Sequence, residues 1–296
     1  MSVFYAMIPA FFWGTTYAVT QFALPDWPPL LLGALRALPA GLLLLLVKPM
    51  WPQGKQWRQL ALLGSVNIGV FFALLFVVAL TLPSAIAGVG MMSMPVFAML
   101  YHGIFYRRIA SRTQMVCGAF LIVLAWLLFD PSELSLKPIG LLALLSAICC
   151  ILLGSDVTKR LGVTMHWWQV LTWQLILGGS ILAIAASIHA IFSPEQYISA
   201  ISHVDLTNIG GMLWLVLLNT ILGYGLYVWL LQRMSVVEFT FGGIANPIAG
   251  IVLGVLLVGE SYTLWQYSLM IGMIVMALLP QFISSMKANK NKNKNK

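Results

Sequence analysis

Arg36 is a single cation inside the apolar stretch 29–47. If this stretch crosses a membrane, placing the charge there costs about 3 kcal/mol or more of free energy. A charge at such a position is expected to serve a function or to be compensated by hydrogen bonds. The planar guanidinium suits a carboxylate, which it can bind through two parallel hydrogen bonds. Two interpretations are open. Arg36 binds a carboxylate-bearing solute, or it is structural and donates to backbone carbonyls and helix ends.

Polar side chains also recur along one face of two other apolar stretches. Their spacing of three and four residues places them on one side of a helix. They are Trp13, Thr16 and Thr20 in the first stretch, and Asn219, Gly223 and Tyr227 in the second, with Tyr224 adjacent to that face. Such residues either line a polar cavity or join helices through hydrogen bonds worth roughly 0.6 kcal/mol each.

Two apolar stretches contain a proline near their middle. Pro95 and Pro247 each remove a backbone hydrogen bond, which bends or breaks a helix and suggests a hinge. The stretch around Pro247 also has small or polar residues at every fourth position: Gly242, Asn246, Gly250 and Gly254. This face predicts close approach of another helix, as part of a gate or as simple packing.

The composition excludes a soluble protein. Of the 296 residues 60% are hydrophobic and 8% are charged, and the mean hydropathy is +0.94, whereas soluble domains have about 25% charged residues. Ten apolar stretches, each near the length of about 20 residues that a membrane span needs, predict an all-α polytopic protein. They cover residues 3–23, 29–47, 59–81, 84–106, 112–129, 138–159, 166–192, 210–232, 236–258 and 262–284.

The basic residues predict the orientation of these spans. With ten spans and a cytoplasmic N-terminus, fourteen of the sixteen Lys and Arg residues fall in cytoplasmic segments. Lys137 falls in an outside segment, and Arg36 lies within a span. Both termini are then cytoplasmic. The net charge of +8 therefore reflects topology, and no nucleic-acid partner is expected. Asp156 lies three and four residues before Lys159 and Arg160, which predicts an ion pair near the cytoplasmic surface.

The two halves of the chain match each other. At an offset of 152 residues Asn67 falls on Asn219, Pro95 on Pro247 and Gln114 on Gln266, while Arg36 falls on Gln174 at an offset of 138. The longer connection 193–209 accounts for the change of offset. Because a unit of five spans is odd-numbered, the second copy enters the membrane from the opposite side, so we expect two inverted five-helix repeats. The predicted domains are 1–130, 138–284 and a Lys/Asn-rich tail at 285–296.

Several short motifs carry a family resemblance. They are Phe12-Trp13-Gly14, the Pro28-Pro29 helix start followed by Arg36, Pro95, Pro247, and Gly259-Glu260. Together they resemble EamA-type transporters of the drug/metabolite transporter superfamily, over nearly the whole chain. The resemblance implies a bacterial inner-membrane carrier that exports amino acids or related small metabolites. One departure is Arg107-Arg108 where the family closes its first repeat with Gly-Glu, which argues against a mechanism that needs a carboxylate in both repeats.

We therefore expect a secondary transporter that binds its substrate near the membrane midplane and exposes it alternately to the two sides. The candidate substrate residues are Arg36, Trp13, Thr16, Asn67, Gln174, Asn219, Tyr224, Tyr227 and Asn246, and the candidate hinge residues are Pro95, Pro247, Gly242 and Gly250. Alternatives of the same fold are an uptake or exchange carrier and an exporter of cationic drugs.

An enzyme acting on lipid-linked substrates is a weaker alternative, because the four His and eight acidic residues are dispersed along the chain. No cofactor or metal is expected, since the three cysteines show no metal-ligand spacing. The expected partners are a small-molecule substrate and the lipid bilayer. A monomer fits the pattern, because the small-residue faces can pack within one chain.

Overall fold

The computed structural model describes residues 3–107, 109–129, 136–231, 233 and 242–294. Throughout these ranges the ordered elements are helices, and no strand is found in them. The described helices are α1 (Val3–Ala23), α2 (Pro29–Val47), α3 (Gln56–Gly64), η1 (Ser65–Val70), α4 (Phe71–Thr81), α5 (Ser84–Gly90), η2 (Met91–Ser93), α6 (Met94–Tyr106), α7 (Arg112–Leu128), α8 (Pro138–Leu161), α9 (Trp167–Phe192), α10 (Pro194–Ser202), α11 (Leu206–Leu213), η3 (Trp214–Tyr224), α12 (Gly225–Leu231), α14 (Ala245–Leu253), η4 (Gly254–Val258) and α15 (Leu264–Lys294).

The all-helical, membrane-spanning class is confirmed. In the described part of the chain, seven helical stretches are long and apolar enough to cross a membrane, and two shorter apolar helices cover Arg112–Leu128 and Ala245–Val258. The predicted stretches 3–23 and 29–47 coincide with α1 and α2. The predicted start of the ninth stretch, at residue 236, lies outside the described residues.

Local sequence signals explain where the helices begin. Pro29 and Pro138 occupy the first turns of α2 and α8, where a missing N–H is tolerated. A capping box opens α7, in which Ser111 and Gln114 exchange side-chain and backbone hydrogen bonds of 2.8 and 3.3 Å. Thr263 and Gln266 make the same reciprocal pair at the start of α15, at 2.9 and 3.2 Å.

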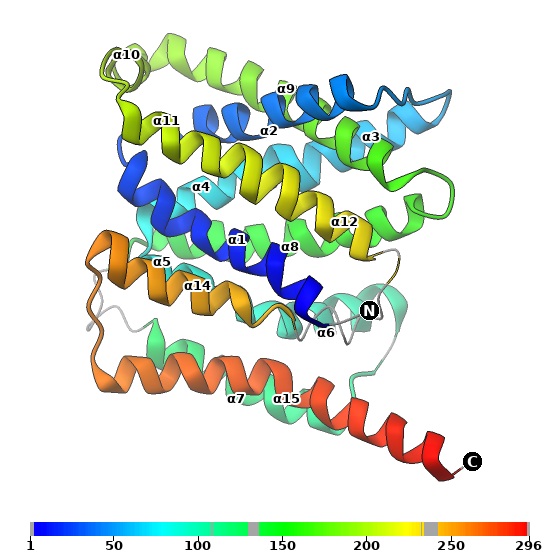
Figure 1. Cartoon of the computed structure of the whole chain (residues 1–296). Helices are drawn as coiled ribbons and strands as arrows, with labels where there is room; N and C mark the ends of the chain where they lie inside the picture. Colours follow the sequence, from blue (N-terminus) through cyan, green and yellow to red (C-terminus); the bar gives the residue numbers. More distant parts are fainter. Residues whose placement is uncertain (1–2, 108, 130–135, 232, 234–241, 295–296) are drawn as a thin grey trace.

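The long helices run roughly parallel or antiparallel in layers (Figure 1). α2 packs closely along α9, α7 packs along α15, and α14 lies between α1 and α5. Glycines make the closest of these approaches possible. A Cβ added at Gly41 would lie 2.7 Å from Ile176, and one added at Gly179 would lie 2.7 Å from the backbone nitrogen of Leu38.

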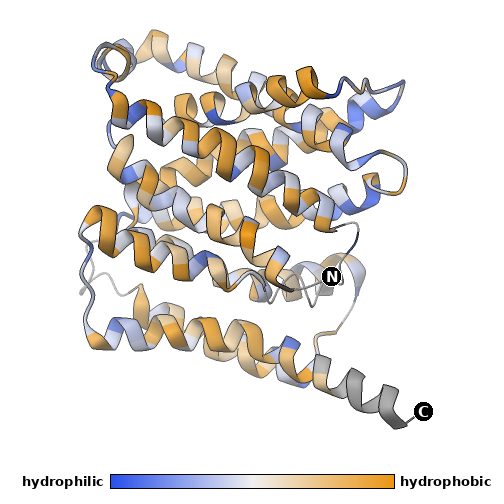
Figure 2. Ribbon diagram, in the orientation of Figure 1, coloured by the Kyte–Doolittle hydropathy of each residue, from blue (hydrophilic) through white to orange (hydrophobic). Residues whose placement is uncertain are grey.

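The outer surface of the bundle is apolar. Figure 2 shows orange residues along the helices, with hydrophilic residues concentrated in connections and at helix ends. Large side chains such as Leu46, Trp126 and Phe192 are about four-fifths exposed, at 80%, 81% and 79%. Such a surface is costly in water and suits contact with lipid chains.

Two segments outside the predicted spans are helical. The connection 193–209 contains a further helix, α10, which begins at Pro194 and carries Glu195 in its first turn. Both residue types favour a helix start. The helix α15 also continues to Lys294, so it includes most of the predicted Lys/Asn-rich tail at 285–296. This segment contains neither Gly nor further Pro, so nothing in it stops the helix.

Candidate functional site

Arg36 lies in the middle of the bundle, with 1% of its surface exposed. Its Nε donates a 2.8 Å hydrogen bond to Thr220 Oγ1 in η3, and the guanidinium carbon stands 4.4 Å from the centre of the Phe72 ring. Arg36 Nη1 is buried and has no hydrogen-bond partner within the described residues. The ion pair found in these residues is Arg160–Asp156, so no acidic side chain described here pairs with Arg36. The site therefore holds a buried positive charge that protein groups compensate only in part.

The partner of Arg36 sits in a π-helical segment. Within η3, the Thr220 hydroxyl donates to the carbonyl of Leu215, five residues earlier, at 2.8 Å. A second π-helical segment, η1, contains Asn67. Such segments replace the i→i−4 pattern by i→i−5 bonds and often occur at functional sites. The wider turn allows Asn219 and Thr220, which are neighbours in sequence, both to face the interior, where both are fully buried.

Asn219 joins η3 to α1. Its Nδ2 donates to Thr16 Oγ1 at 2.8 Å, and Thr15 Oγ1 donates to Asn219 Oδ1 at 3.3 Å. The indole Nε1 of Trp13 donates to the Asn219 carbonyl at 3.0 Å. The predicted polar face of α1 therefore meets the predicted polar face of η3.

Asn67 joins η1 to α9. Its Nδ2 donates to Gln174 Oε1 at 2.8 Å, and Tyr224 OH donates to the Asn67 carbonyl at 3.4 Å. Asn67 Oδ1 and Gln174 Nε2 are buried without a partner in the described part of the chain. On the other side Asn67 lies against Gly154 of α8, where an added Cβ would lie 2.1 Å from Asn67 Oδ1.

Three aromatic rings connect these two polar groups. The ring centres of Trp13 and Tyr224 are 5.1 Å apart, those of Trp13 and Tyr227 are 4.9 Å apart, and those of the two tyrosines are 5.6 Å apart. Phe72, which carries the Arg36 guanidinium on its face, lies 6.0 Å from Tyr224. Tyr227 OH and Ser155 Oγ share a 2.6 Å hydrogen bond. Aromatic faces next to a cation can bind both apolar and cationic groups of a ligand.

Eight of the nine candidate substrate residues thus form one connected cluster. They are Arg36, Trp13, Thr16, Asn67, Gln174, Asn219, Tyr224 and Tyr227. Asn246 lies outside this cluster. Its backbone carbonyl oxygen packs against Gly14 of α1, where a Cβ added at Gly14 would lie 2.1 Å from that oxygen. Among the described residues, no hydrogen bond joins the Asn246 side chain to the cluster.

The candidate hinge residues lie at helix interruptions and close contacts. Pro95 follows the short 3-10 turn η2, and Pro247 lies in the first turn of α14. A Cβ added at Gly250 would lie 3.0 Å from the carbonyl oxygen of Ser84 in α5, and one added at Gly242 would lie 2.4 Å from Ala6 Cβ in α1. The face of small residues therefore packs against α1 and α5. The role of these four residues as a hinge stays a prediction.

Sequence reasoning missed Thr220, Thr15, Phe72 and Ser155. A detectable signal existed for Thr220, because it is a second polar residue directly after Asn219 in an apolar stretch. A regular α-helix would turn Thr220 about 100° away from Asn219, so helical spacing does not place the two residues on one face. Phe72 could not be found in this way, since one phenylalanine among many apolar residues carries no signal of its own.

Comparison with known proteins places this arrangement in a family. A sequence model of the EamA-like transporter family matches residues 1–129. Protein PecM of Dickeya dadantii is 32% identical over 246 residues, which cover 82% of this chain and 80% of PecM. The chain belongs to the EamA-like transporter family. It is thus a membrane transporter and not an enzyme.

Other relatives agree with this assignment. The uncharacterized inner membrane transporter YedA of Escherichia coli K12 is 25% identical, covering 90% of this chain and 86% of its own length. A probable amino-acid metabolite efflux pump of Salmonella typhimurium is 23% identical, covering 88% of each. These relatives and the apolar helices identify a multi-pass protein of the bacterial inner membrane.

The fold also matches a solved structure. One crystal structure of a protein superimposes with a TM-score of 0.63 and 16% identity, over 94% of this chain and 96% of the other. At this identity the match concerns the fold alone.

Proposed function

We propose that this EamA-like transporter exports amino acids or related small metabolites, and that Arg36 binds the carboxylate of the substrate. The observation that carries the proposal is the buried guanidinium of Arg36, which has one hydrogen bond to Thr220, an unpartnered Nη1 and no acidic partner in the described residues. Burying such a charge costs several kcal/mol unless an anion compensates it. A substrate carboxylate supplies that anion and can use the free edge of the guanidinium.

The aromatic cluster completes the proposed site. A series of contacts leads from Arg36 to Phe72, Tyr224, Tyr227 and Trp13 in turn. The substrate's carboxylate would lie at Arg36, and the rest of the molecule along these rings. The efflux-pump name of the Salmonella relative agrees with an amino-acid metabolite as substrate.

We further propose two inverted repeats, at 1–130 and 138–284, that form ten spans with both termini cytoplasmic. Matched local features support this. The capping boxes at Ser111/Gln114 and Thr263/Gln266 are offset by 152 residues. Arg107 and Gly259 have the same offset, and both have a positive φ, of 52° and 74°. The pairing of α2 with α9 and of α7 with α15 brings matching helices together, as a twofold axis between the repeats requires.

The polar cluster has the same offsets. Asn219 lies against Thr16, and its counterpart Asn67 lies against Gly154, 138 residues after Thr16. Arg36 binds η3, and its counterpart Gln174 binds η1. In the proposed mechanism the substrate binds at this interface between the repeats, and the two sides of the membrane gain access to it in turn.

Reconstituted transport tests the proposal. Labelled amino acids, nucleobases and cationic drugs would be loaded into proteoliposomes, and their efflux measured with and without a pH gradient. The proposal predicts efflux of amino acids, and a selective loss of carboxylate substrates in Arg36→Ala compared with folded wild-type protein. Asn219→Ala would slow efflux of all substrates, because Asn219 joins helices and binds no carboxylate. Efflux of cations alone would favour the drug-exporter alternative, for which the aromatic cluster is the supporting observation.

A further inference from the structure

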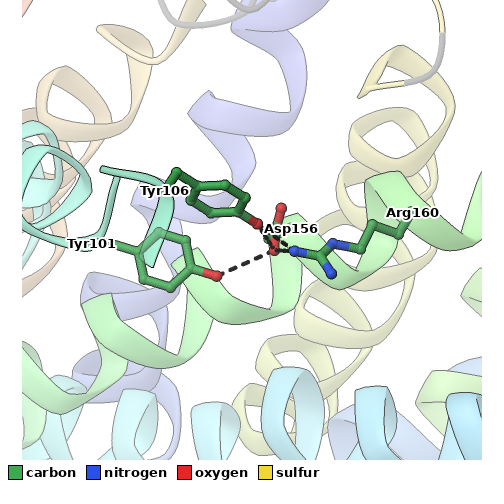
Figure 3. A network of polar contacts seen from close by, with 4 residues as sticks. All are labelled: Tyr101, Tyr106, Asp156 and Arg160. Atoms are coloured by element: carbon green, nitrogen blue, oxygen red, sulfur yellow. Dashed lines mark hydrogen bonds and ion pairs between the residues drawn. The ribbon is translucent and has the colours of Figure 1, made fainter. Parts of the chain in front are cut away.

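A network of four side chains joins α6 to α8 near the end of both helices (Figure 3). Asp156 Oδ2 accepts hydrogen bonds from Tyr101 OH at 3.2 Å and from Tyr106 OH at 2.7 Å. Arg160, one turn further along α8, forms an ion pair with Asp156 at 2.9 Å and also donates to Tyr106 OH. We call these four residues the α6–α8 latch. One carboxylate oxygen thus holds both tyrosines of α6 to α8.

A second carboxylate makes a matching contact at the opposite end of the bundle. Glu260 Oε1 accepts from the backbone N–H of Ser84 at 2.5 Å, and Oε2 accepts from the N–H of Ala85 at 3.3 Å and from Tyr262 OH at 2.7 Å. This contact, which we call the α5–Glu260 latch, holds the first turn of α5 to the chain that follows η4. Gly254 makes room for it, since an added Cβ would lie 2.2 Å from Glu260 Oε2.

The two latches hold opposite ends of one interrupted helical stretch, Ser84–Tyr106. The 3-10 turn η2 and Pro95 separate its first half, α5, from its second half, α6. All seven residues of α5 are buried, whereas Met94–Met99 in α6 are only half-buried. Because η2 and Pro95 interrupt the helical stretch, α5 can separate from the η4 region while α6 stays packed against α8. In the same way, α6 can separate from α8 while α5 stays in place.

We propose that Asp156 and Glu260 are positioning residues for transport, each holding one end of the substrate pathway closed. This inference rests on the proposed alternating access but not on the proposed substrate. When the α6–α8 latch releases, α6 separates from α8 and opens the pathway at that end. When the α5–Glu260 latch releases, α5 separates from the η4 region and opens the other end. In a two-state exchange, weakening one latch favours the state that is open at that end and disfavours the opposite one.

Cysteine accessibility tests this without any substrate. The native Cys117, Cys149 and Cys150 would be replaced by alanine. A reporter would be introduced either by Met94→Cys, two turns before Tyr101, or by Ala87→Cys, in α5 and two residues after Ala85. A charged, membrane-impermeant maleimide would then be added to right-side-out or inside-out vesicles. Labelling rates are compared between Asp156→Asn, Glu260→Gln and the parent, with Glu195→Gln on the exposed surface of α10 as the matched control.

Asp156→Asn is expected to raise labelling of the Met94 reporter about fivefold or more from the side where α6 ends, and to lower labelling of the Ala87 reporter. Glu260→Gln is expected to do the reverse, and Glu195→Gln to change neither rate. Asp156→Glu, which retains the charge, should restore much of the parent behaviour. If Asp156→Asn does not fold, Tyr106→Phe removes the two hydrogen bonds of the Tyr106 hydroxyl and leaves the Asp156–Arg160 ion pair in place, and it should shift labelling in the same direction.

Two outcomes would overturn the inference: an increase at both reporters in each variant, which means general loosening, or no change at either. Failure of the proposed amino-acid export would leave these labelling results intact, so the two proposals can fail separately.

Discussion

Asn67 and Asn219 stand 152 residues apart, and each lies in a π-helical segment with its side-chain amide bonded to a different helix. Asn219 donates to a hydroxyl of α1, and Asn67 to an amide of α9. The two contacts join helices from opposite halves of the chain. The same residues that belong to the candidate site therefore also contribute to the stability of the helix bundle.

The bond between Asn219 and Thr16 should have a measurable coupling energy. A double-mutant cycle of Asn219→Leu and Thr16→Val, read by thermal or chemical unfolding in detergent, is expected to give a coupling of about 0.6–1.7 kcal/mol. Thr81→Val serves as the control, because the Thr81 hydroxyl donates only to Val77 of its own helix. A coupling of zero would mean that the contact between α1 and η3 adds nothing to stability.

Gly154→Ala should destabilise the protein, because the added methyl group would lie 2.1 Å from Asn67 Oδ1. Overpacking of this kind costs about 1–3 kcal/mol. Gly210→Ala is the matched control, since nothing lies within 4 Å of its added Cβ and alanine favours a helix over glycine. We expect a lower unfolding temperature for Gly154→Ala and an equal or higher one for Gly210→Ala. Equal stability of the two variants would contradict the packing of Asn67 against α8.

His166 should titrate below its ordinary pKa. It lies between α8 and α9, where its Nδ1 accepts a 3.1 Å hydrogen bond from the backbone N–H of Trp168. Partial burial and the positive charges of Lys48 and Arg233 lower the pKa of its imidazole below 6.5. The neutral ring then stabilises the folded state above pH 6.5, and this contribution is lost as the pH falls through the lowered pKa. An NMR titration of labelled histidine, assigned with His166→Ala, checks this; a midpoint at or above 6.5 would count against it.

Much of the helical framework could be predicted from the sequence. The apolar stretches 3–23 and 29–47 coincide with α1 and α2, because Pro25, Pro28 and Pro29 mark the break between them unambiguously. Gln114 and Gln266 match each other at the offset of 152 residues in the sequence, and each caps the start of a helix in the structure. Apolar periodicity and turn residues are local signals, and they suffice for such features.

The remaining features depend on backbone detail that the sequence does not show. The polar faces of the first and eighth spans were predicted separately, but their direct contact through Thr16 and Asn219 follows from packing. The position of Thr220 beside Arg36 depends on the π-helical turn, which no residue in η3 signals. Asp156 was predicted to pair with Lys159 or Arg160, and Arg160 proved to be its partner. Its bonds to Tyr101 and Tyr106 come from a distant helix and could not be foreseen.

Thr220→Val should weaken substrate binding more than it affects the maximal rate. Without the hydroxyl, Arg36 Nε loses its 2.8 Å partner and the guanidinium is no longer held in place. Loss of one hydrogen bond to a charged group, about 1.5–3 kcal/mol, corresponds to a rise in KM of roughly 10-fold or more for carboxylate substrates. Initial efflux rates over a range of substrate concentrations measure this. An unchanged KM would show that Thr220 does not position Arg36.

The binding of a carboxylate by Arg36 is tested most directly by competition in proteoliposomes. Uptake of the best-transported labelled amino acid in exchange for internal amino acid would be inhibited by unlabelled amino acid or by its decarboxylated amine. Wild-type protein should prefer the carboxylate-bearing competitor by about tenfold or more, since one lost charge-assisted contact is worth at least 1.4 kcal/mol. Arg36→Gln should lose most of that preference while the folded protein remains monodisperse. Equal inhibition by both competitors in the wild type, or an unchanged preference in Arg36→Gln, would contradict the account.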